Sequence, residues 1–450
     1  WTFTVHGIAD ETVSLHVRGG DPPWIWGAND VVDGNGQWAI EIELPTEGLA
    51  DGPYDFVARS ASYDSATFRV VADGTAPAIA HVWTLEAATG HGIEELTLSF
   101  SEPIDGLELS KLQLLRDGSG PNLLGPGQLL TGEGDEWTLS NLGGLTSTPG
   151  EYVLSLAADS ITDMVGNTGP SGGGGPIFAF AIVDANAASA GDHEIWLEAS
   201  GWAGLQVLVD GDPVHQWTDA SLIHQIIVLG GDGDDQLTLA APESLLPADG
   251  VLFLAAAGID EVNVLGTSGD DVIQFSDGEI VFAATDWPRW IEYTDVEQVD
   301  LTSSAGADDV SVFDTAIKLG GATAWGTDSA LSLGSGTVEV VSDQSFQNLS
   351  VLEEEAGTLV VGSGHSATVN GTLSIETNGT LTKSGSGTLV IAGSQSHASA
   401  AALEVDGGTV ELNSNAGTPA AVGTPAVANL SITVNDGLLK LGADQDVAGL

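Results

Sequence analysis

Apolar and polar residues alternate over short stretches along nearly the whole chain. Examples are residues 97–100 (TLSF), 206–209 (QVLV) and 409–412 (TVEL). A repeat of two places successive side chains on opposite faces of a strand, whereas a helix needs apolar residues every three or four positions. Turn-forming residues interrupt the pattern every few positions, and glycine alone occupies 60 of the 450 positions. The pattern predicts an all-β chain of many short strands.

The chain is strongly acidic. Asp and Glu number 64 and Lys and Arg only 9, so the formal net charge is −55 at pH 7. Nucleic acid and anionic membrane surfaces are unfavourable partners, because binding to either depends on positive charge on the protein. Divalent cations and salt-rich water are both compatible with this acidity, and composition alone does not separate calcium binding from adaptation to high salt.

Two absences restrict the chemistry further. The sequence has no cysteine, which excludes disulfides, zinc–thiolate sites and cysteine nucleophiles. No apolar run approaches the ~18 residues that a membrane-spanning helix needs. The sequence begins at Trp1 without a signal peptide and ends inside a strand-like pattern at 441–450. We therefore expect a segment of a longer extracellular or cell-surface protein, whose signal and anchor lie outside it.

Residues 1–73 have the pattern of a small β-sandwich. The residues Asp33-Gly34-Asn35-Gly36 are of the types that a tight hairpin turn needs. The segments DGNGQW (33–38) and LADGPYDFVA (49–58) resemble the bacterial immunoglobulin-like (Ig-like) domains that are strung along surface proteins. The resemblance implies a first Ig-like β-sandwich, and the sequence DGTAP (73–77) is similar to the joint between tandem domains of that kind.

Residues 74–184 predict a second sandwich. The segments LTLSFSEPIDGLELSKLQLLRDG (96–118) and GEYVLSLAADSITDMVGN (150–167) resemble another bacterial Ig-like family, found in S-layer and adhesin-like proteins. Glu102, Asp163 and Asn167 could meet near one end of this domain; the simpler interpretation is an Asx-turn and a strand end. A run of four glycines at 172–175 is interpreted as a loop before the last strand.

Residues 185–315 repeat a theme of apolar strand, Gly/Asp turn and apolar strand. Residues 230–238, GGDGDDQLT, fit the nonapeptide G-G-x-G-x-D-x-U-x, in which U is apolar. The segment resembles a hemolysin-type (RTX-like) calcium-binding repeat, and the resemblance assigns the ligand role to Asp235. Residues 266–274 match with Thr267 in place of the second glycine, and there the ligand would be Asp271. The resemblance implies a degenerate calcium-repeat β-solenoid that binds Ca²⁺.

Further aspartates accompany these two. The same turns contain Asp232, Asp234 and Asp270, and more degenerate copies contain Asp260 and Asp309. The matching aspartates, at 235, 260, 271 and 309, are 25, 11 and 38 residues apart, whereas stacked repeats are spaced by about nine. A regular calcium ladder is therefore not expected. Two interpretations stay open: one or two isolated calcium sites, or plain turns in which Asp accepts backbone N–H groups.

Residues 316–450 are more periodic. A Gly-Thr strand start recurs at Gly336, Gly357, Gly371, Gly379, Gly387 and Gly408, with steps of 21, 14, 8, 8 and 21 residues. Steps near 21 suit one coil of a β-solenoid with about three short strands. The segments GTLTKSGSGTLVIAG (379–393) and LEVDGGTVEL (403–412) resemble the passenger repeats of autotransporter-type surface proteins, which are parallel β-helices.

The sequence thus predicts two Ig-like β-sandwiches followed by β-solenoid repeats. No catalytic motif is found, and the expected role is structural and adhesive, with a cell-surface or matrix polysaccharide or protein as partner. A third interpretation is a passive spacer without a ligand. The main alternative is a carbohydrate-binding or carbohydrate-active β-helix. It rests on Trp24 and Trp26, and on Trp287 and Trp290, as sugar-stacking residues, although large aromatics in small β-domains are mostly buried. It also requires a carboxylate pair in a groove.

Overall fold

The computed structural model describes residues 2–6, 12–19, 24–33, 35, 37–41, 51–61, 65–84, 92–170, 175–187, 191–283, 288–302, 306–320, 329–417 and 427–449. Nearly all of its regular structure is β-strand, which confirms the all-β prediction. The described helices are single turns: α1 (Gly143–Thr146) and 3-10 turns at Leu109–Lys111, Ala185–Ala187, Ala220–Leu222 and Glu243–Leu245. None of them is long and apolar enough to cross a membrane.

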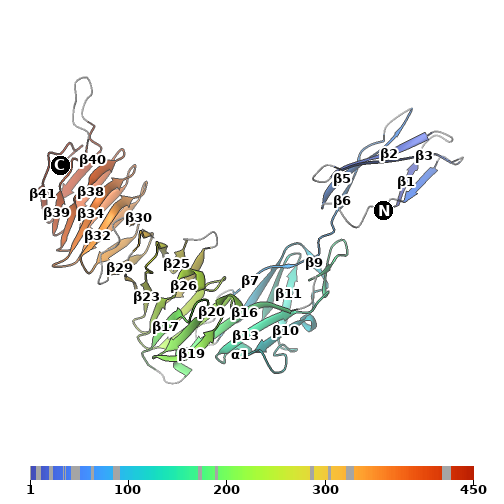
Figure 1. Ribbon diagram of the computed structural model, residues 1–450, viewed down its shortest axis with the longest axis horizontal. Coiled ribbons are helices and arrows are strands. Elements are labelled where there is room, and N and C mark those ends of the chain that lie inside the picture. The colour runs from blue at the N-terminus through green and yellow to red at the C-terminus, as the bar shows by residue number, and fades with distance from the viewer. Residues whose placement is uncertain are drawn as a thin grey trace.

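The N-terminal region contains two small antiparallel sheets. One pairs β1 (Thr2–His6) with β4 (Gln37–Glu41), and the other has the order β3 (Trp24–Val31), β2 (Thr12–Gly19), β5 (Gly52–Ser60), β6 (Phe68–Ala72). The turn that was expected to close a hairpin at 33–36 instead connects β3 and β4, which belong to different sheets. Gly34 and Gly36 themselves lie outside the described residues. Figure 1 shows this region set apart from the rest of the chain.

The next region forms one antiparallel sheet, a very small second sheet and the beginning of a third. The first has the order β11 (Leu129–Glu133), β12 (Glu136–Ser140), β8 (Glu95–Phe100), β7 (Ile79–Thr84). The second has the order β15 (Thr168–Gly169), β14 (Ile161–Asp163), β9 (Ile104–Asp105). The expected glycine loop falls mainly on 171–174, outside the described residues.

Two long sheets contain the remaining described strands, and we call them the larger and the smaller sheet. The larger sheet begins with antiparallel β10 (Leu112–Arg116), β13 (Gly150–Leu156) and β16 (Gly175–Asp184). It continues through β20 (Gln225–Asp232), β22 (Val251–Ala257), β26 (Arg289–Thr294), β25 (Glu279–Phe282), β24 (Val272–Ser276), β28 (Asp309–Val312), β30 (Ala330–Leu333), β32 (Gln344–Val351), β34 (Ser366–Ile375), β36 (Thr388–Ile391), β39 (Thr409–Leu412) and β41 (Leu438–Leu441), with β37 (Ser394–His397) also paired to β34.

The smaller sheet runs beside it. Its order is β19 (Asp212–Trp217), β18 (Leu205–Val209), β17 (Glu194–Ala199), β21 (Gln236–Ala240), β23 (Glu261–Leu265), β27 (Gln298–Thr302), β29 (Ala316–Gly320), β31 (Thr337–Val340), β33 (Ala356–Val361), β35 (Thr380–Ser384), β38 (Ala401–Val405) and β40 (Leu430–Val434).

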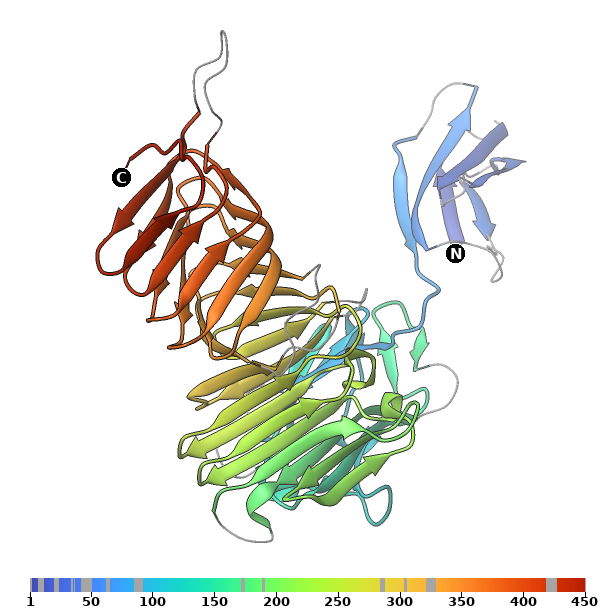
Figure 2. The same ribbon diagram turned by 60° about the vertical axis from the view of Figure 1, so that its left-hand side comes forward.

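From β20 to β41 the chain passes back and forth between these two sheets, and most neighbouring strands are parallel. Figure 2 shows the strands following one another along one axis. Pairing is uninterrupted across residue 315, because β27 pairs with β29 and β28 pairs with β30. The coil that begins at β35 has three strands, since β36 and β37 both lie beside the long strand β34.

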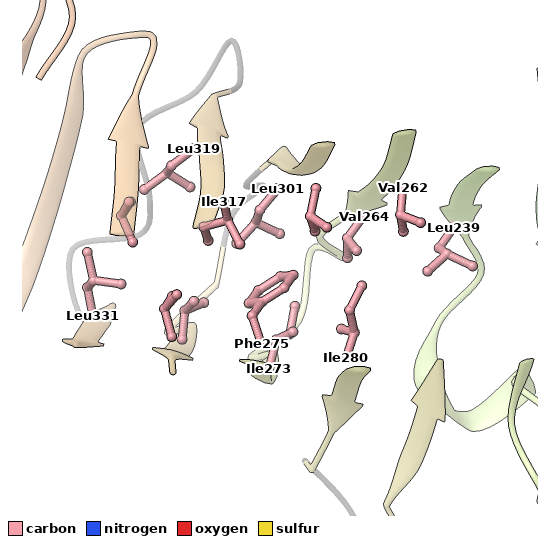
Figure 3. Close-up of a cluster of buried hydrophobic side chains, with 14 of the residues drawn as sticks. Leu239, Val262, Val264, Ile273, Phe275, Ile280, Leu301, Ile317, Leu319 and Leu331 are labelled. Atoms are coloured by element: carbon pink, nitrogen blue, oxygen red, sulfur yellow. The ribbon is translucent and has the colours of Figure 1, made fainter. Parts of the chain in front are cut away.

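Alternating side chains from both sheets fill a continuous core. Leu301 and Ile317 of the smaller sheet approach Phe275 and Ile273 of the larger sheet, as Figure 3 shows. Most of these strands contribute every second residue to this core, which is why the sequence alternates with a period of two. Burial of one apolar face per strand is the main stabilising contribution that such short strands can make.

Strands β20 and β22 are buried on both faces. Ile226 and Val228 belong to the core between the two long sheets, whereas Ile227 and Leu229 pack with residues of β8, β12 and β13 in a second core. This explains why these segments are continuous apolar runs rather than alternating ones. The expected boundary between 184 and 185 therefore falls inside a continuous sheet, in which β16 pairs with β20.

Candidate functional site

The predicted Gly/Asp turns lead directly into strands of different sheets. Asp235 precedes β21 and Asp260 precedes β23, and these strands are parallel neighbours in the smaller sheet. Asp271 precedes β24 of the larger sheet. The two best matches to the calcium repeat, at 230–238 and 266–274, thus belong to two separate stacks of turns.

In the first stack, each carboxylate accepts a backbone N–H from the preceding coil. The N–H of His193 donates to Oδ1 of Asp235 at 2.9 Å, that of Asp235 to Oδ1 of Asp260 at 2.8 Å, and that of Asp260 to Oε2 of Glu297 at 2.8 Å. Asp235 is 1% exposed and Asp260 is fully buried. We call this series the carboxylate ladder. It satisfies backbone groups that close stacking would otherwise leave buried and unpaired.

A second series runs in the opposite direction, one residue earlier in each turn. The N–H of Asp234 donates to Oδ1 of Asp192 at 3.0 Å, and the N–H of Ile259 donates to Oδ1 of Asp234 at 2.8 Å. The residues that precede Asp234 and Ile259 are both glycine. Close stacking requires this, because a Cβ at Gly258 would lie 1.9 Å from the carbonyl oxygen of Gly233. The repeated Gly-x-Asp triplet is therefore the unit that joins one coil to the next.

The other stack makes the same two kinds of hydrogen bond at equivalent positions. The N–H of Asp271 donates to Oδ1 of Asp308 at 3.2 Å, and the N–H of Ala307 donates to Oδ1 of Asp270 at 2.9 Å. Asp308 thus occupies the position equivalent to Asp235, whereas the sequence motif selected Asp309. Asp309 pairs with Val272 and is the exposed first residue of β28. The sequence motif thus selected a residue one position after the equivalent one, Asp309 instead of Asp308. The match at 304–312 lacks the glycines that fix the register of the motif.

Burial raises the pKa of three aspartates in these turns, Asp235, Asp260 and Asp308. Burial is the main cause for Asp235, whose pKa rises to about 6; the N–H of His193 lowers it and the charge of Asp260 raises it again. Burial also raises the pKa values of Asp260 and Asp308. One oxygen of each of Asp235 and Asp260, Oδ2, is buried and has no hydrogen-bond partner among the described residues. Such oxygens are costly while the carboxyl is ionised.

The predicted calcium ligands do not gather around one point. Their carboxylates are distributed over two stacks, and five of the seven, at 234, 235, 260, 270 and 271, accept hydrogen bonds within the protein. Asp232 lies at the exposed end of β20. Calcium needs six to eight oxygen ligands around one ion, and among the described residues no group of three carboxylates within ligand distance lies at these turns. Calcium at these turns stays a prediction of the resemblance.

A different acidic group lies beside the segment that joins the first two regions. Asp73, Glu102 and Asp163 have ligand atoms within 4.8 Å of one another, the one such set of three found among the described residues. Asp163 also forms an Asx-turn, in which its Oδ1 accepts the N–H groups of 165–167. Asn167 joins the group by donating to Asp163 Oδ2 at 2.6 Å and to the Asp73 carbonyl at 3.0 Å. The structure therefore brings together the residues that the sequence suggested could meet, and adds Asp73.

Charge repulsion between these carboxylates affects the pKa of Glu102. Burial, then the charges of Asp73 and Asp163, raise the pKa of Glu102. Burial alone would raise the pKa of Asp163, but hydrogen bonds from Asn167 and the neighbouring N–H groups hold it below its usual value. The group is thus a concentration of negative charge with internal hydrogen bonds.

A shallow acidic hollow of about 530 Å³ lies over the starts of β17, β21 and β23. Asp192, Glu194, Asp210, Asp234 and Glu261 are among its lining residues. The buried His193 contacts it as well, and its Nδ1 lies 2.9 Å from Oδ2 of Asp210. The hollow would attract cations and repel anionic ligands.

The residues proposed for sugar chemistry are only partly described. Trp287 and the side chains of Trp24 and Trp26 lie outside the described residues, and Trp290 is half-buried against Gly250. Sequence reasoning missed Trp202, which is fully exposed at the turn between β17 and β18. No sequence signal separates Trp202 from a core tryptophan, since its exposure depends on how that turn projects.

A carboxyl pair was also missed. Asp300 lies on the outward side of β27, and burial, then the neighbouring Glu261, raises its pKa to about 6. Glu261 lines the acidic hollow, but Asp300 does not. The two carboxyls come from adjacent parallel strands, so their proximity follows from a register that the sequence does not display.

No protein-family model matches this chain, and a search of curated proteins found no relative.

Proposed function

We propose that this chain is a structural and adhesive segment of a secreted or surface-anchored bacterial protein, in which two Ig-like sandwiches lead into a β-solenoid. The observation that carries the proposal is the pair of parallel sheets that continue from β20 to β41 around one core. A chain that coils in this way grows in length with each coil, which suits a spacer that displays surface at a distance.

The turns support the same proposal. Their acidic side chains bind the backbone of neighbouring coils rather than converging on a reaction centre. Calcium is predicted by the resemblance and not by the geometry of these turns, so the structural role does not depend on it. The net charge of −55 would keep copies apart in solution while they are held at a surface.

Surface display and attachment test the proposal directly. An antibody against residues 316–450 is applied to cells that make the protein, before and after permeabilisation, and attachment of these cells is compared with that of an in-frame deletion strain. We expect labelling of intact cells and weaker attachment after deletion. Labelling only after permeabilisation would reject the surface role. Surface labelling with unchanged attachment would reject the adhesive role and leave a passive spacer.

A further inference from the structure

A column of serine side chains crosses the outer face of the larger sheet. The five serines are aligned strand to strand by the sheet register: Ser311, Ser332, Ser350, Ser374 and Ser396. A second column lies two residues earlier on the last four strands: Ala330, Asn348, Thr372 and Ser394. We call these nine residues the hydroxyl strip. Neighbours within a column are about 4.8 Å apart and the two columns about 7 Å apart, as strand geometry dictates.

The strip carries no charge in a chain that is otherwise strongly acidic. β30, β32, β34 and β37 contain no Asp, Glu, Lys or Arg, although the chain carries a net charge of −55. β28, which supplies Ser311, begins with the exposed Asp309, and this acid pairs with Ala330 and borders the strip. The one titratable residue in these strands, His397, is buried, and burial lowers its pKa to about 4. The turns that follow β28, β32 and β34 carry the exposed acids Asp314, Glu354 and Glu376. A neutral strip is thus bordered by negative charge.

The hydroxyl groups of the strip can form further hydrogen bonds. Ser332 and Ser350 pair with each other at 2.8 Å, and Thr372 pairs with Ser394 at 2.9 Å. The hydroxyls of the other three serines, at 311, 374 and 396, form no hydrogen bond with another described residue. Each hydroxyl offers one donor and two acceptor positions. A partner can therefore meet a regular array of donors and acceptors on a surface of small side chains.

We propose that the hydroxyl strip is the adhesive contact of this chain and that its partner is an uncharged polysaccharide with a regular repeat. The inference rests on the proposed adhesive function and names the partner of that function. A polymer of neutral sugars supplies closely spaced hydroxyls that both donate and accept, and it approaches the bordering acidic turns without charge repulsion. A second copy of this chain would bring two sets of those acidic turns together.

The strip has no aromatic platform, so each contact is weak. A hydrogen bond exchanged with water contributes only about 0.5–1.5 kcal/mol. Retention must then come from many contacts made at once, which favours a long or insoluble polymer over a short oligosaccharide. Anionic polysaccharides are disfavoured, because the bordering turns repel them.

Co-sedimentation with insoluble polysaccharides tests the inference. The full chain is mixed with cellulose, chitin, curdlan and starch as neutral polymers and with calcium-free cross-linked polygalacturonate as the anionic one, at 0.15 M NaCl. The strip variants are Ser350→Ala with Ser374→Ala, and Ser350→Asp with Ser374→Asp. The matched control is Thr358→Asp with Thr382→Asp, since these paired threonines occupy half-buried outward positions on the smaller sheet.

We expect at least one neutral polymer to retain the wild-type chain and the control. We expect the Ala pair to reduce retention several-fold and the Asp pair to abolish it, with circular dichroism spectra unchanged. Absence of retention on every neutral polymer, or equal loss in the control, would overturn the inference. So would a concentration-dependent doubling of mass that only the strip variants abolish, because the strip would then bind a second copy. Cell attachment can persist in each of these cases, so failure here is distinct from failure of the proposed function.

Discussion

At Asp260, a single carboxyl group joins two coils. Its Oδ1 accepts the N–H of Asp235 at 2.8 Å, whereas its buried Oδ2 has no hydrogen-bond partner among the residues that the structure describes. Asp260→Ala leaves that N–H buried without an acceptor, so we expect the free energy of unfolding to fall by about 1–3 kcal/mol. Asp260→Asn keeps an acceptor oxygen and removes the buried charge, so we expect a change of less than about 1 kcal/mol. Urea denaturation of both variants checks this, and equal losses would show that the acceptor oxygen is not what matters.

Asp235 makes stability depend on pH. Burial raises its pKa to about 6 in the folded chain, whereas an unfolded Asp titrates near about 3.9. The folded state therefore binds the proton more readily, and the stability that protonation contributes is present at low pH and is lost as pH rises through about 6. Relative to Asp235→Asn, we expect the wild type to gain about 1–2 kcal/mol between pH 7.5 and pH 5. Thermal melts of both proteins at the two pH values measure this gain, and a difference independent of pH would contradict it.

The sequence could locate part of this ladder and not the rest. The Gly-x-Asp pattern selects Asp235 and Asp260 correctly as equivalent turn positions. It does not reveal that the carboxylates accept N–H groups from the preceding coil, because the residues concerned are 25 or more positions apart. For Asp308 the pattern is too degenerate to fix the register, which only strand pairing supplies.

At the scale of elements, close stacking of coils demands glycine at particular turns. A Cβ at Gly258 would meet the Gly233 carbonyl oxygen at 1.9 Å, whereas a Cβ at Gly144 in α1 would meet nothing within 4 Å. We expect Gly258→Ala to lower the free energy of unfolding by about 1–3 kcal/mol or more, because rigid backbone must shift. Gly144→Ala, the matched control, should change it by less than about 1 kcal/mol, since Ala favours helix over Gly. Chemical denaturation compares the two, and similar effects would show that the coils can separate without cost.

Strand existence was predictable, but strand partnership was not. The Gly-Thr starts of 316–450 have irregular spacing because they mark strands of both sheets: Gly336 and Gly379 precede β31 and β35 of the smaller sheet, and Gly387 precedes β36 of the larger. The apolar runs of β20 and β22 indicate burial on both faces. Only the fold shows that residues of β8, β12 and β13 pack against the second face. Local pattern fixes where strands are, whereas pairing depends on distant residues.

For the whole molecule, net charge opposes compactness. The −55 charge produces self-repulsion that salt screens, with a Debye length of about 10 Å at 0.1 M and about 3 Å at 1 M. We expect the thermal midpoint to rise by several degrees between 0.05 and 0.5 M NaCl, with the larger part of the rise at the low end. Differential scanning calorimetry measures it. A midpoint that falls over this range would mean that ion pairs, rather than repulsion, dominate the electrostatics.

Calcium binding is a further property that the sequence predicts for the whole chain. The hydrogen bonds of the Gly/Asp turns form without it. The resemblance at 230–238 and 266–274 predicts that calcium raises the thermal midpoint above the value in magnesium at equal ionic strength, because an ion bound only by the folded state stabilises it by mass action. The rise should disappear in Asp235→Ala with Asp271→Ala. The readout is the calcium-minus-magnesium difference within each protein, since the substitutions also break the hydrogen bonds of the turns. Equal midpoints in calcium and magnesium would leave hydrogen bonds as the link between coils. A calcium-specific rise that survives the double substitution would direct attention to Asp73, Glu102 and Asp163, whose ligand atoms already lie within 4.8 Å of one another.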